Sequence, residues 1–360
     1  MEQQYIVDDY KQLEQVIGRY NPAKVFLVCG KSFDKMSFGK ELLNILATHG
    51  ITLVRFSDFS PNPVYESVYQ GVKLFTSSKA SMIIAVGGGS ALDVAKCIKL
   101  YSNMDLSVNF LQQKIKKNDI PLLAVPTTAG TGSESTRYAV IYYQENKQSV
   151  THDSAIPAVV FFAPATLDSV PEYHKKASLL DALSHAIESF WSVNANEKSR
   201  SYAKQAISII LDNIDEYMGG NKESNVQMMK AANLAGKAIN ITQTTAGHAM
   251  CYKLTSKFGY AHGHSAALCN AVLWPYMIAH GGNLELFIEL AKCFGQERAL
   301  EGAQAFREII HEFSLDIPSI TDEELLKELT ATVNPVRLQN NPVQLETAVI
   351  YDLYKQVGNI

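Results

Sequence analysis

The sequence has no excess of basic residues, no CxxC cysteine pair and no long apolar run. Its 360 residues carry 32 Lys and Arg against 36 Asp and Glu, a net charge of −4, so a nucleic acid would meet no attractive field. The five cysteines are an odd number, which disfavours both a disulfide framework and a zinc ribbon. No stretch reaches the roughly 18 apolar residues that a membrane helix needs, so a membrane-spanning protein is not expected.

The start of the chain also has no secretory pattern, because Met1 is followed by polar and acidic residues and by no basic segment leading into an apolar one. Together with the unpaired cysteines, this predicts a cytoplasmic protein. The composition, 47% hydrophobic and 19% charged, is that of an ordinary globular chain. Its length exceeds what a single core usually organises and favours two domains.

The two halves of the sequence differ in their periodicity. The first half alternates longer amphipathic segments with short apolar runs, which predicts parallel strands joined by helices; these runs are Val25–Val28, Ile51–Phe56, Met82–Val86, Leu122–Val125 and Ala158–Phe162. The second half has helical apolar spacing in Glu172–Val193, Ser199–Met218, Ser224–Thr242, Ala266–His280, Asn283–Phe294 and Glu301–Phe313. We therefore expect an α/β domain with a parallel sheet over residues 1–171 and an all-helical domain over residues 172–360.

A glycine-rich loop follows the third apolar run. Gly87, Gly88 and Gly89 lead into Ser90 and a helical segment containing Asp93. Glycines let backbone amides approach a ligand closely, and a helix N-terminus attracts anions, so the loop suits the pyrophosphate of a dinucleotide. The same residues also fit a tight turn without a ligand, with Ser90 as the helix N-cap and Asp93 as its capping partner.

A second candidate loop follows the fourth apolar run and contains Thr127, Thr128, Thr131 and Ser133. Its hydroxyls and glycines could surround a ribose or a phosphate, although a solvated surface loop has the same composition. Two such loops at successive strand ends favour the ligand, because ligands bind at the carboxyl ends of parallel strands.

Four residues of the second half form a candidate metal site. Asp181 and His185 are four apart on a helical segment and leave the same face. A buried Asp–His hydrogen bond explains that pair equally well. His248 and His262 add two imidazoles in apolar, glycine-flanked surroundings, and one carboxylate with three imidazoles suits a divalent transition metal that keeps a position open for a substrate oxygen.

With these motifs in this order, the chain resembles the iron-containing alcohol dehydrogenase family over nearly its whole length. The resemblance implies a Rossmann-like, dehydroquinate synthase-like α/β domain that binds the dinucleotide, followed by an α-helical metal-binding domain. It implies that Asp181, His185, His248 and His262 bind iron(II), with zinc as an alternative, and that Lys147 lies near the nicotinamide ribose. The implied activity is a nicotinamide-linked alcohol dehydrogenase or aldehyde reductase, and the implied assembly is a homodimer or larger.

One departure from the family concerns the nucleotide. Many members end their first strand with an aspartate that binds the adenosine ribose hydroxyls, whereas this chain has Gly30 there. Repulsion toward a 2′-phosphate is then missing, and Lys31 and Ser32 could bind that phosphate, so we expect NADPH to be preferred over NADH. The alternative is that Gly30 only forms a turn and Asp34 supplies the acid.

A second departure lies four residues after His248, where many members carry another histidine and this chain has Tyr252 followed by Lys253. We expect Tyr252 to be a candidate proton donor. This segment and the closing Asn334–Pro342 segment resemble the subgroup of phosphonoacetaldehyde reductases, which act on a small aldehyde with an anionic head group. Three cations, Arg137, Lys253 and Arg337, are candidate partners of that anion, although each could equally be a solvated charge.

Other readings of the same motifs remain open. A related enzyme could use zinc and NAD to oxidise a polyol, or could catalyse a ring-forming lyase reaction like that of dehydroquinate synthase. A hydrolase would use the metal without a nucleotide. A non-catalytic metal or nucleotide sensor with this fold is a further alternative.

Overall fold

The computed structural model describes residues 4–360. The chain divides into two compact units, one formed by residues up to 128 with 132–170 and the other by residues 129–131 with 171–360. The short segment 129–131, which follows the fourth apolar run, therefore belongs with the second half of the chain.

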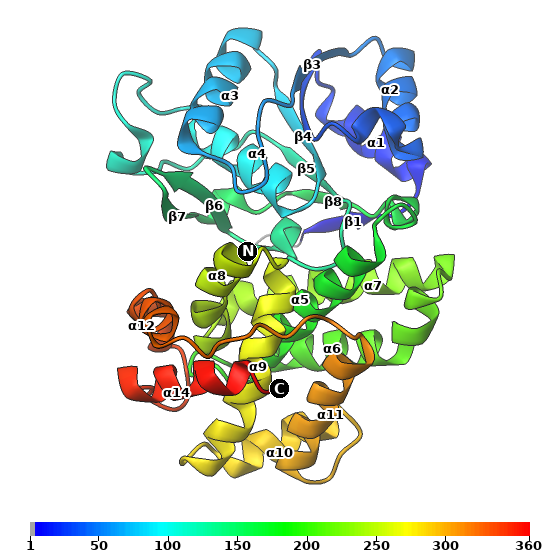
Figure 1. The fold of residues 1–360 in the computed structure, drawn as a ribbon. Helices are drawn as coiled ribbons and strands as arrows, with labels where there is room; N and C mark the ends of the chain where they lie inside the picture. The colour runs from blue at the N-terminus through cyan, green and yellow to red at the C-terminus, as the bar shows by residue number, and fades with distance from the viewer. Residues whose placement is uncertain (1–3) are drawn as a thin grey trace. The chain divides into compact units, whose positions relative to one another are not determined.

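The first unit is built on a six-stranded sheet in which every paired strand is parallel (Figure 1), in the order β1-β8-β5-β4-β2-β3. The strands are β1 (Tyr5–Val7), β2 (Lys24–Cys29), β3 (Thr52–Phe56), β4 (Met82–Gly87), β5 (Leu122–Pro126) and β8 (Val159–Phe161). Gly87 at the end of β4 pairs in register with Pro126 at the end of β5. The two loops that the sequence singles out therefore leave the sheet side by side.

Helices cover both faces of this sheet (Figure 1): α1 (Tyr10–Tyr20) and α2 (Ser37–Thr48) on one, α3 (Tyr65–Ser78) and α4 (Gly89–Tyr101) on the other. Successive side chains of a strand point to opposite faces. Val25 and Leu27 of β2 accordingly pack with α1 and α2, and Phe26 and Val28 pack with α3 and α4. Burial on both faces explains the continuous apolar runs, and the five expected strands and the α/β class are confirmed.

Three strands of the first unit were not expected from the sequence. One is β1 at the edge of the sheet, which has only three residues. The others are β6 (Tyr138–Tyr143) and β7 (Asn146–Thr151), which form an antiparallel hairpin outside the main sheet.

The second unit is helical, as expected. Its helices are α5 (Glu172–Trp191), α6 (Glu197–Met218), α7 (Lys222–Thr242), α8 (Ala246–Phe258), α9 (His262–Ala279), α10 (Leu284–Lys292), α11 (Ala299–Glu312), α12 (Glu323–Ala331), α13 (Pro335–Leu338) and α14 (Thr347–Val357). The six expected helices are present, and α8, α12, α13 and α14 are additional. The central element is α5, which packs against α6, α7 and α9 and is buried without interruption from Leu179 to Trp191.

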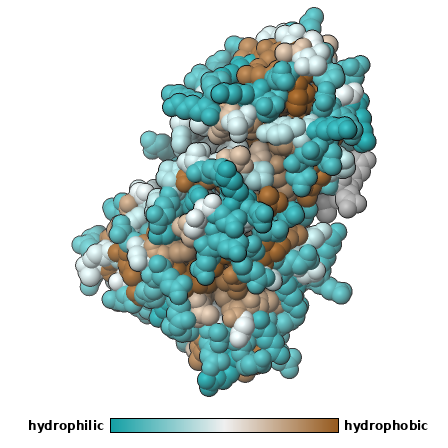
Figure 2. All heavy atoms as spheres, turned by 90° about the vertical axis from the view of Figure 1, so that its right-hand side faces the viewer, coloured by the Kyte–Doolittle hydropathy of each residue, from teal (hydrophilic) through white to brown (hydrophobic). Residues whose placement is uncertain are grey.

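Among residues 4–360, no helix is both long and apolar enough to cross a membrane. Hydrophilic side chains cover most of the face shown in Figure 2, and hydrophobic ones are visible mainly between them.

Candidate metal centre and cofactor loops

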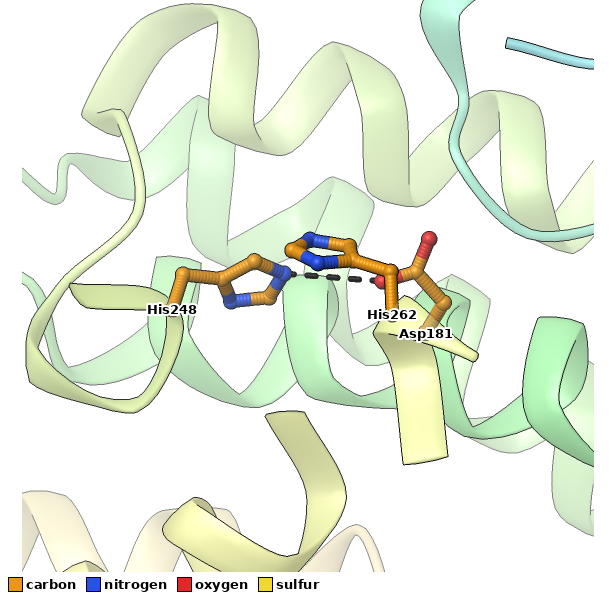
Figure 3. Close-up of side chains that lie close together, drawn as sticks. All are labelled: Asp181, His248 and His262. Atoms are coloured by element: carbon orange, nitrogen blue, oxygen red, sulfur yellow. Dashed lines mark ion pairs between the residues drawn. The ribbon is translucent and has the colours of Figure 1, made fainter. Parts of the chain in front are cut away.

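Three helices of the second unit bring the candidate ligands together. Asp181 and His185 lie one turn apart on α5, His248 lies in the first turn of α8, and His262 is the first residue of α9. Figure 3 shows the carboxylate of Asp181 and the imidazoles of His248 and His262 directed toward one another. One ligand atom from each of these three residues lies within 4.8 Å of the other two.

His185 lies beside this group. Its Nε2 is 3.9 Å from Oδ1 of Asp181, and its ring stacks on that of His248 with 4.5 Å between the centroids. Asp181, His185 and His248 are buried, whereas His262 is partly exposed. The site therefore has a closed inner side and one imidazole at its accessible side, an arrangement that leaves a position for a substrate.

Three atoms of the site lack a hydrogen bond among the described residues: Oδ1 of Asp181, Nδ1 of His185 and Nε2 of His248. Two of them, Oδ1 of Asp181 and Nε2 of His248, are 3.5 Å apart. A buried polar atom without a partner costs about 1–3 kcal/mol. A cation between the two atoms satisfies both, and a carboxylate oxygen with imidazole nitrogens is a donor set that iron(II) and zinc accept. The residues present fit a divalent transition metal.

A second carboxylate, that of Glu188, contacts the ring nitrogen of His248 that is turned away from Asp181. It is fully buried and contacts Nδ1 of His248 through Oε1 at 2.5 Å. Asn270 Nδ2 donates to Oε1 at 3.0 Å, and the backbone N–H and hydroxyl of Thr245 donate to Oε2. Because Nδ1 then carries the proton donated to Glu188, the lone pair of Nε2 faces the site. The sequence interpretation missed Glu188, although it lies seven residues after Asp181 on the same helix face.

The electrostatics of this cluster favour positive charge. Burial lowers the pKa of His248, but Glu188 and Asp181 outweigh burial and raise it to about 10. Burial raises the pKa of Glu188, but His248 and the hydrogen bonds from Asn270 and Thr245 lower it to about 2. The two carboxylates therefore favour a positive charge on His248, and a divalent metal bound at Nε2 would displace its proton and supply that charge instead.

Glycines allow the helices to approach closely enough to form the site. A Cβ on Gly247 would lie 1.9 Å from Oδ1 of Asn270 and 2.6 Å from Oε1 of Glu188. A Cβ on Gly263 would lie 2.1 Å from the carbonyl oxygen of Ala177 on α5. Both are distances that real Cβ atoms do not show, so each histidine ligand depends on the glycine beside it.

In the first unit, the glycine loop joins β4 directly to α4. Gly88 is the N-cap of α4, which begins at Gly89. The interpretation of Ser90 as N-cap is therefore wrong; Ser90 lies within the first turn, because the backbone becomes helical earlier than the cap pattern suggested. A Cβ on Gly87 would lie 2.6 Å from Cβ of Ala91, and one on Gly88 would lie 3.4 Å from Oγ1 of Thr128.

The two loops are directly bonded, since the backbone N–H of Thr127 donates to the carbonyl of Gly87 at 3.1 Å. Thr127 is buried, whereas Gly87–Ser90 and Thr128 are partly exposed. A narrow, glycine-lined surface at a helix N-terminus results, and this surface suits the pyrophosphate of a dinucleotide.

Asp93 lies one turn further into α4 and belongs to an internal network. It accepts hydrogen bonds from Ser133 Oγ at 2.8 Å and from the backbone N–H of Val140 at 3.0 Å. The ammonium of Lys96, which is fully buried, donates to Ser133 Oγ at 2.9 Å. Burial lowers the pKa of Lys96 to about 8 and raises that of Asp93, and each residue opposes the shift of the other.

This network fixes the loop after β5 against α4. Lys147, on β7, lies near enough to Asp93 to lower the pKa of its carboxyl. Thr131, the remaining candidate of the loop after β5, belongs with the second unit. Gly130 belongs there too, and a Cβ added to it would lie 2.8 Å from the carbonyl oxygen of Ser178 on α5. The sequence interpretation missed Lys96, because a lysine inside an apolar helix gives no sign of its partners.

At the end of β2, the surroundings of Gly30 and Asp34 bear on the two explanations of the missing aspartate. A Cβ at this position would meet nothing within 4 Å, and its φ lies outside the left-handed region. Neither the turn nor the packing therefore requires glycine. Asp34, the alternative acid, binds Arg55 through both carboxylate oxygens at 2.8 Å.

The three candidate cations for a substrate anion lie in different environments. Arg337, on α13, donates to Oγ1 of Thr244. Burial raises the pKa of Tyr252, and the charge of Arg337 opposes this shift. The ring of Tyr252 stacks on that of His262, with 5.5 Å between the centroids. Lys253 forms an ion pair with Glu328 at 2.8 Å. Arg137 belongs to the first unit and lies 3.5 Å from Asp153.

Comparison with protein families shows matches over nearly the whole chain. Residues 4–164 match the family described as iron-containing alcohol dehydrogenase, and residues 175–358 match the C-terminal family of Fe-containing alcohol dehydrogenases.

Two relatives illustrate how sequence identity and coverage vary among the similar proteins. A long-chain-alcohol dehydrogenase of Geobacillus thermodenitrificans is 32% identical over 276 residues, which cover 75% of this chain and 69% of that protein. An NADPH-dependent butanol dehydrogenase of Clostridium saccharobutylicum is 26% identical over 355 residues, which cover 96% of this chain and 84% of that protein.

Solved structures share the fold. An iron-containing alcohol dehydrogenase from Thermococcus thioreducens is similar with a TM-score of 0.91 and 19% identity, covering 99% of this chain and 98% of that one. A sulfoacetaldehyde reductase from Bifidobacterium kashiwanohense, solved in complex with NAD+, has a TM-score of 0.88 and 24% identity over 99% of this chain and 97% of that one.

Proposed function

The chain belongs to the iron-containing alcohol dehydrogenase family, and from that premise we propose that it reduces a small aldehyde with hydride from NADPH at an iron(II) site formed by Asp181, His185, His248 and His262. At the coarser level, it is an oxidoreductase of alcohols and aldehydes. The observation that carries the proposal is the pair of buried atoms without hydrogen bonds, Oδ1 of Asp181 and Nε2 of His248, held 3.5 Å apart.

Bound iron would supply Lewis-acid chemistry toward the carbonyl oxygen of the aldehyde, and NADPH would supply the hydride. Residues around the site orient the ligands and shield the site from water. Glu188 keeps the lone pair of His248 Nε2 directed into the site, and the buried inner wall excludes water. Zinc fits the same donors, so reconstitution with each metal is needed to distinguish the two.

The preference for NADPH rests on the end of β2. A Cβ at position 30 would meet nothing within 4 Å, yet the aspartate is missing, and Asp34 is already paired with Arg55. Lys31 and Ser32, both exposed, are therefore available to a 2′-phosphate without a competing carboxylate at the strand end. The name of the clostridial relative, which concerns that protein, agrees with this direction.

For the substrate, we infer a small aldehyde with an anionic head, such as phosphonoacetaldehyde, which would be reduced to 2-hydroxyethylphosphonate. Arg337 is the candidate partner of the anion, because it lies close to Tyr252, which itself stacks on His262. Lys253 is less suitable, since Glu328 already binds its ammonium. The phenol of Tyr252 is the candidate proton donor for the alkoxide.

The test is anaerobic reconstitution with iron(II) or zinc, followed by oxidation of NADPH and NADH with phosphonoacetaldehyde and with propanal. We expect iron to support faster oxidation of NADPH, with phosphonoacetaldehyde as the better substrate, and His262→Ala to abolish the reaction. Arg337→Gln should raise the KM for phosphonoacetaldehyde about 10- to 100-fold, as expected for loss of a charge-assisted pair, and leave the KM for propanal unchanged.

Other results would replace parts of the proposal. Equal use of propanal by wild type and Arg337→Gln, with no reaction of the phosphonate, would keep the family activity and remove the anionic substrate. Zinc-supported oxidation of a polyol with NAD would favour the polyol dehydrogenase alternative. Tight metal binding without any cofactor oxidation would favour a hydrolase or a sensor.

The nucleotide preference has its own variant pair. Gly30→Asp should lower the ratio of kcat/KM for NADPH to that for NADH by about tenfold or more, because a carboxylate repels the 2′-phosphate and binds ribose hydroxyls. Gly30→Asn, with the same shape and no charge, is the control and should change the ratio much less. Similar ratios in wild type and Gly30→Asp would show that this position does not select the nucleotide.

A further inference from the structure

A cavity lies in the first unit, away from the cofactor loops. It has a volume of about 1210 Å³ and is lined by the segments that precede β5 and β8, by the end of α1 and by the start of β1. These are the amino ends of the parallel strands, whereas the glycine and threonine loops leave the carboxyl ends of β4 and β5. The cavity is therefore separate from the dinucleotide loops.

The lining of this cavity is rich in cations. Arg19, Lys99, Lys117 and Arg137 face two carboxylates, Asp119 and Asp153. Both carboxylates already have partners within the cavity, since Asp119 pairs with Lys117 at 3.1 Å and Asp153 with Arg137 at 3.5 Å. Among residues 4–360, Arg19 and Lys99 have no carboxylate within ion-pair distance.

Lys99 is the most informative of these residues. It lies in the last turn of α4, only 5% of its surface is exposed, and its ammonium makes no hydrogen bond with any described residue. An ammonium that is largely removed from water and has no carboxylate partner is costly, and this one lines the cavity. Burial accordingly lowers the pKa of Lys99 to about 8, with Asp119 opposing the shift only in part. An anion in the cavity would remove this cost.

Other groups complete a binding surface. Nδ1 of His152 accepts a hydrogen bond from the backbone N–H of Ser154, which leaves Nε2–H as a donor. Tyr20 also lines the cavity, and 42% of its surface is exposed. The volume of about 1210 Å³ exceeds that of a simple inorganic anion and lies somewhat above the usual range of small-molecule sites, roughly 300–1,000 Å³.

We propose that this cavity binds a small phosphorylated metabolite, with its phosphate group on Lys99 and with Arg19 adding positive charge elsewhere in the lining. A phosphate matches the unpaired ammonium of Lys99, and its remaining oxygens accept hydrogen bonds from donors of the lining such as His152. A sugar phosphate has the size to occupy the rest of the cavity. The site is independent of the proposed aldehyde reduction, because no residue of the cofactor loops or the metal centre lines it.

The test is isothermal titration of the iron-loaded protein, saturated with NADPH so that the cofactor loops are occupied. The titrants are orthophosphate, ribose 5-phosphate and uncharged ribose. We expect ribose 5-phosphate to bind more tightly than orthophosphate and ribose not to bind. Lys99→Met should weaken the binding of ribose 5-phosphate about tenfold or more, because a charge-assisted contact is lost. Arg19→Gln should weaken the same binding several-fold.

Two control variants test whether the phosphate compound binds in this cavity and not at another cation. Lys40→Met removes an exposed cation of α2 that does not line the cavity and should bind like wild type. Arg337→Gln removes the proposed substrate cation of the other unit and should also leave the affinity unchanged. If Lys99→Met does not fold, the affinity of Arg19→Gln for ribose 5-phosphate tests the proposal instead. Absence of phosphate binding, or equal affinity in wild type and in a folded cavity variant, would overturn the proposal.

Discussion

Glu188 illustrates how a residue without direct access to a substrate can control the metal centre. Its carboxylate is fully buried, bonded to Nδ1 of His248 and stabilised by Thr245 and Asn270. Glu188→Gln keeps the shape and removes the charge, so Nδ1–H loses its charged partner and Nε2 becomes a weaker ligand. We expect the affinity for iron(II) to fall about 10- to 100-fold, measured by competition with a chelator.

The matched control is Glu172→Gln, at the exposed start of the same helix, where Glu172 pairs only with Lys176. This variant should bind iron like wild type. An unchanged affinity in Glu188→Gln, with native secondary structure, would show that Glu188 is structural only.

Lys99 allows a pH prediction with a defined sign. Its pKa is lowered by burial to about 8 in the folded chain, against an ordinary value of 10.5. Between these values the unfolded chain holds a proton that the folded chain has released, so the free energy of unfolding rises with pH across this window. Below about pH 8 the ammonium is charged in both states and the full burial cost remains. The gain over the window is on the order of 1–3 kcal/mol.

Lys99→Met lacks this titration. Chemical denaturation at several values between pH 7 and pH 10 should therefore show wild type gaining stability relative to Lys99→Met, while wild type and Lys40→Met change in parallel. A constant difference between wild type and Lys99→Met would mean that the ammonium is not desolvated in the folded protein.

The metal ligands and their support differ in how far the sequence predicts them. Asp181 and His185 could be named as candidates because a helical spacing of four places them on one face. Glu188 extends that face, but its partners Thr245 and Asn270 are 57 and 82 residues away in the chain. Nothing local distinguishes it from an acidic residue near a helix end. Lys96 was missed for the same reason, since its partners lie 37 to 42 residues away.

At the scale of elements, the position of the start of α8 depends on a close contact at Gly247, which leaves no room for a side chain. A Cβ on Gly247 would overlap Asn270 and Glu188, so Gly247→Ala must displace α8 or the carboxylate that supports His248. We expect a loss of about 1–3 kcal/mol of stability, as for overpacking of a core, and weaker binding of iron. Thermal unfolding and metal titration measure the two effects.

Gly18→Ala in α1 is the matched control. An added Cβ there meets nothing within 4 Å, so alanine should stabilise the helix by roughly 0.5–1 kcal/mol. Equal stability changes in the two variants would show that helix propensity, and not the contact with Asn270, determines the effect at Gly247.

The elements that the sequence predicts are those with continuous apolar runs or long helical periods. The hairpin of β6 and β7 has neither, and its turn lacks the usual glycine. Gln144 and Glu145 both have positive φ, 48° and 63°, values that hairpin turns normally assign to Asn-Gly. The short edge strand β1 and the helix α8, whose first turn carries glycine and histidine, likewise give weak local signals.

At the scale of the whole molecule, the two candidate sites lie in different units. The candidate metal ligands come from α5, α8 and α9 of the second unit, and the candidate cofactor loops follow β4 and β5 of the first. Periodicity predicted this division into an α/β part and a helical part. It could not reveal that residues 129–131, which directly follow the first unit's β5, belong with the second unit, because that assignment depends on packing such as that of Gly130 against Ser178.

This division predicts which regions each ligand stabilises. A ligand that binds only the folded state stabilises the elements that hold it. Removal of iron with a chelator should therefore increase amide hydrogen exchange mainly in α5, α8 and α9, whereas NADPH should slow exchange in Gly87–Ser90 and the start of α4. Hydrogen exchange read by mass spectrometry measures both effects on the same protein. His262→Ala should lose the response to the chelator and keep the response to NADPH, and a chelator response spread evenly over both units would contradict the assignment of the metal to the helical unit.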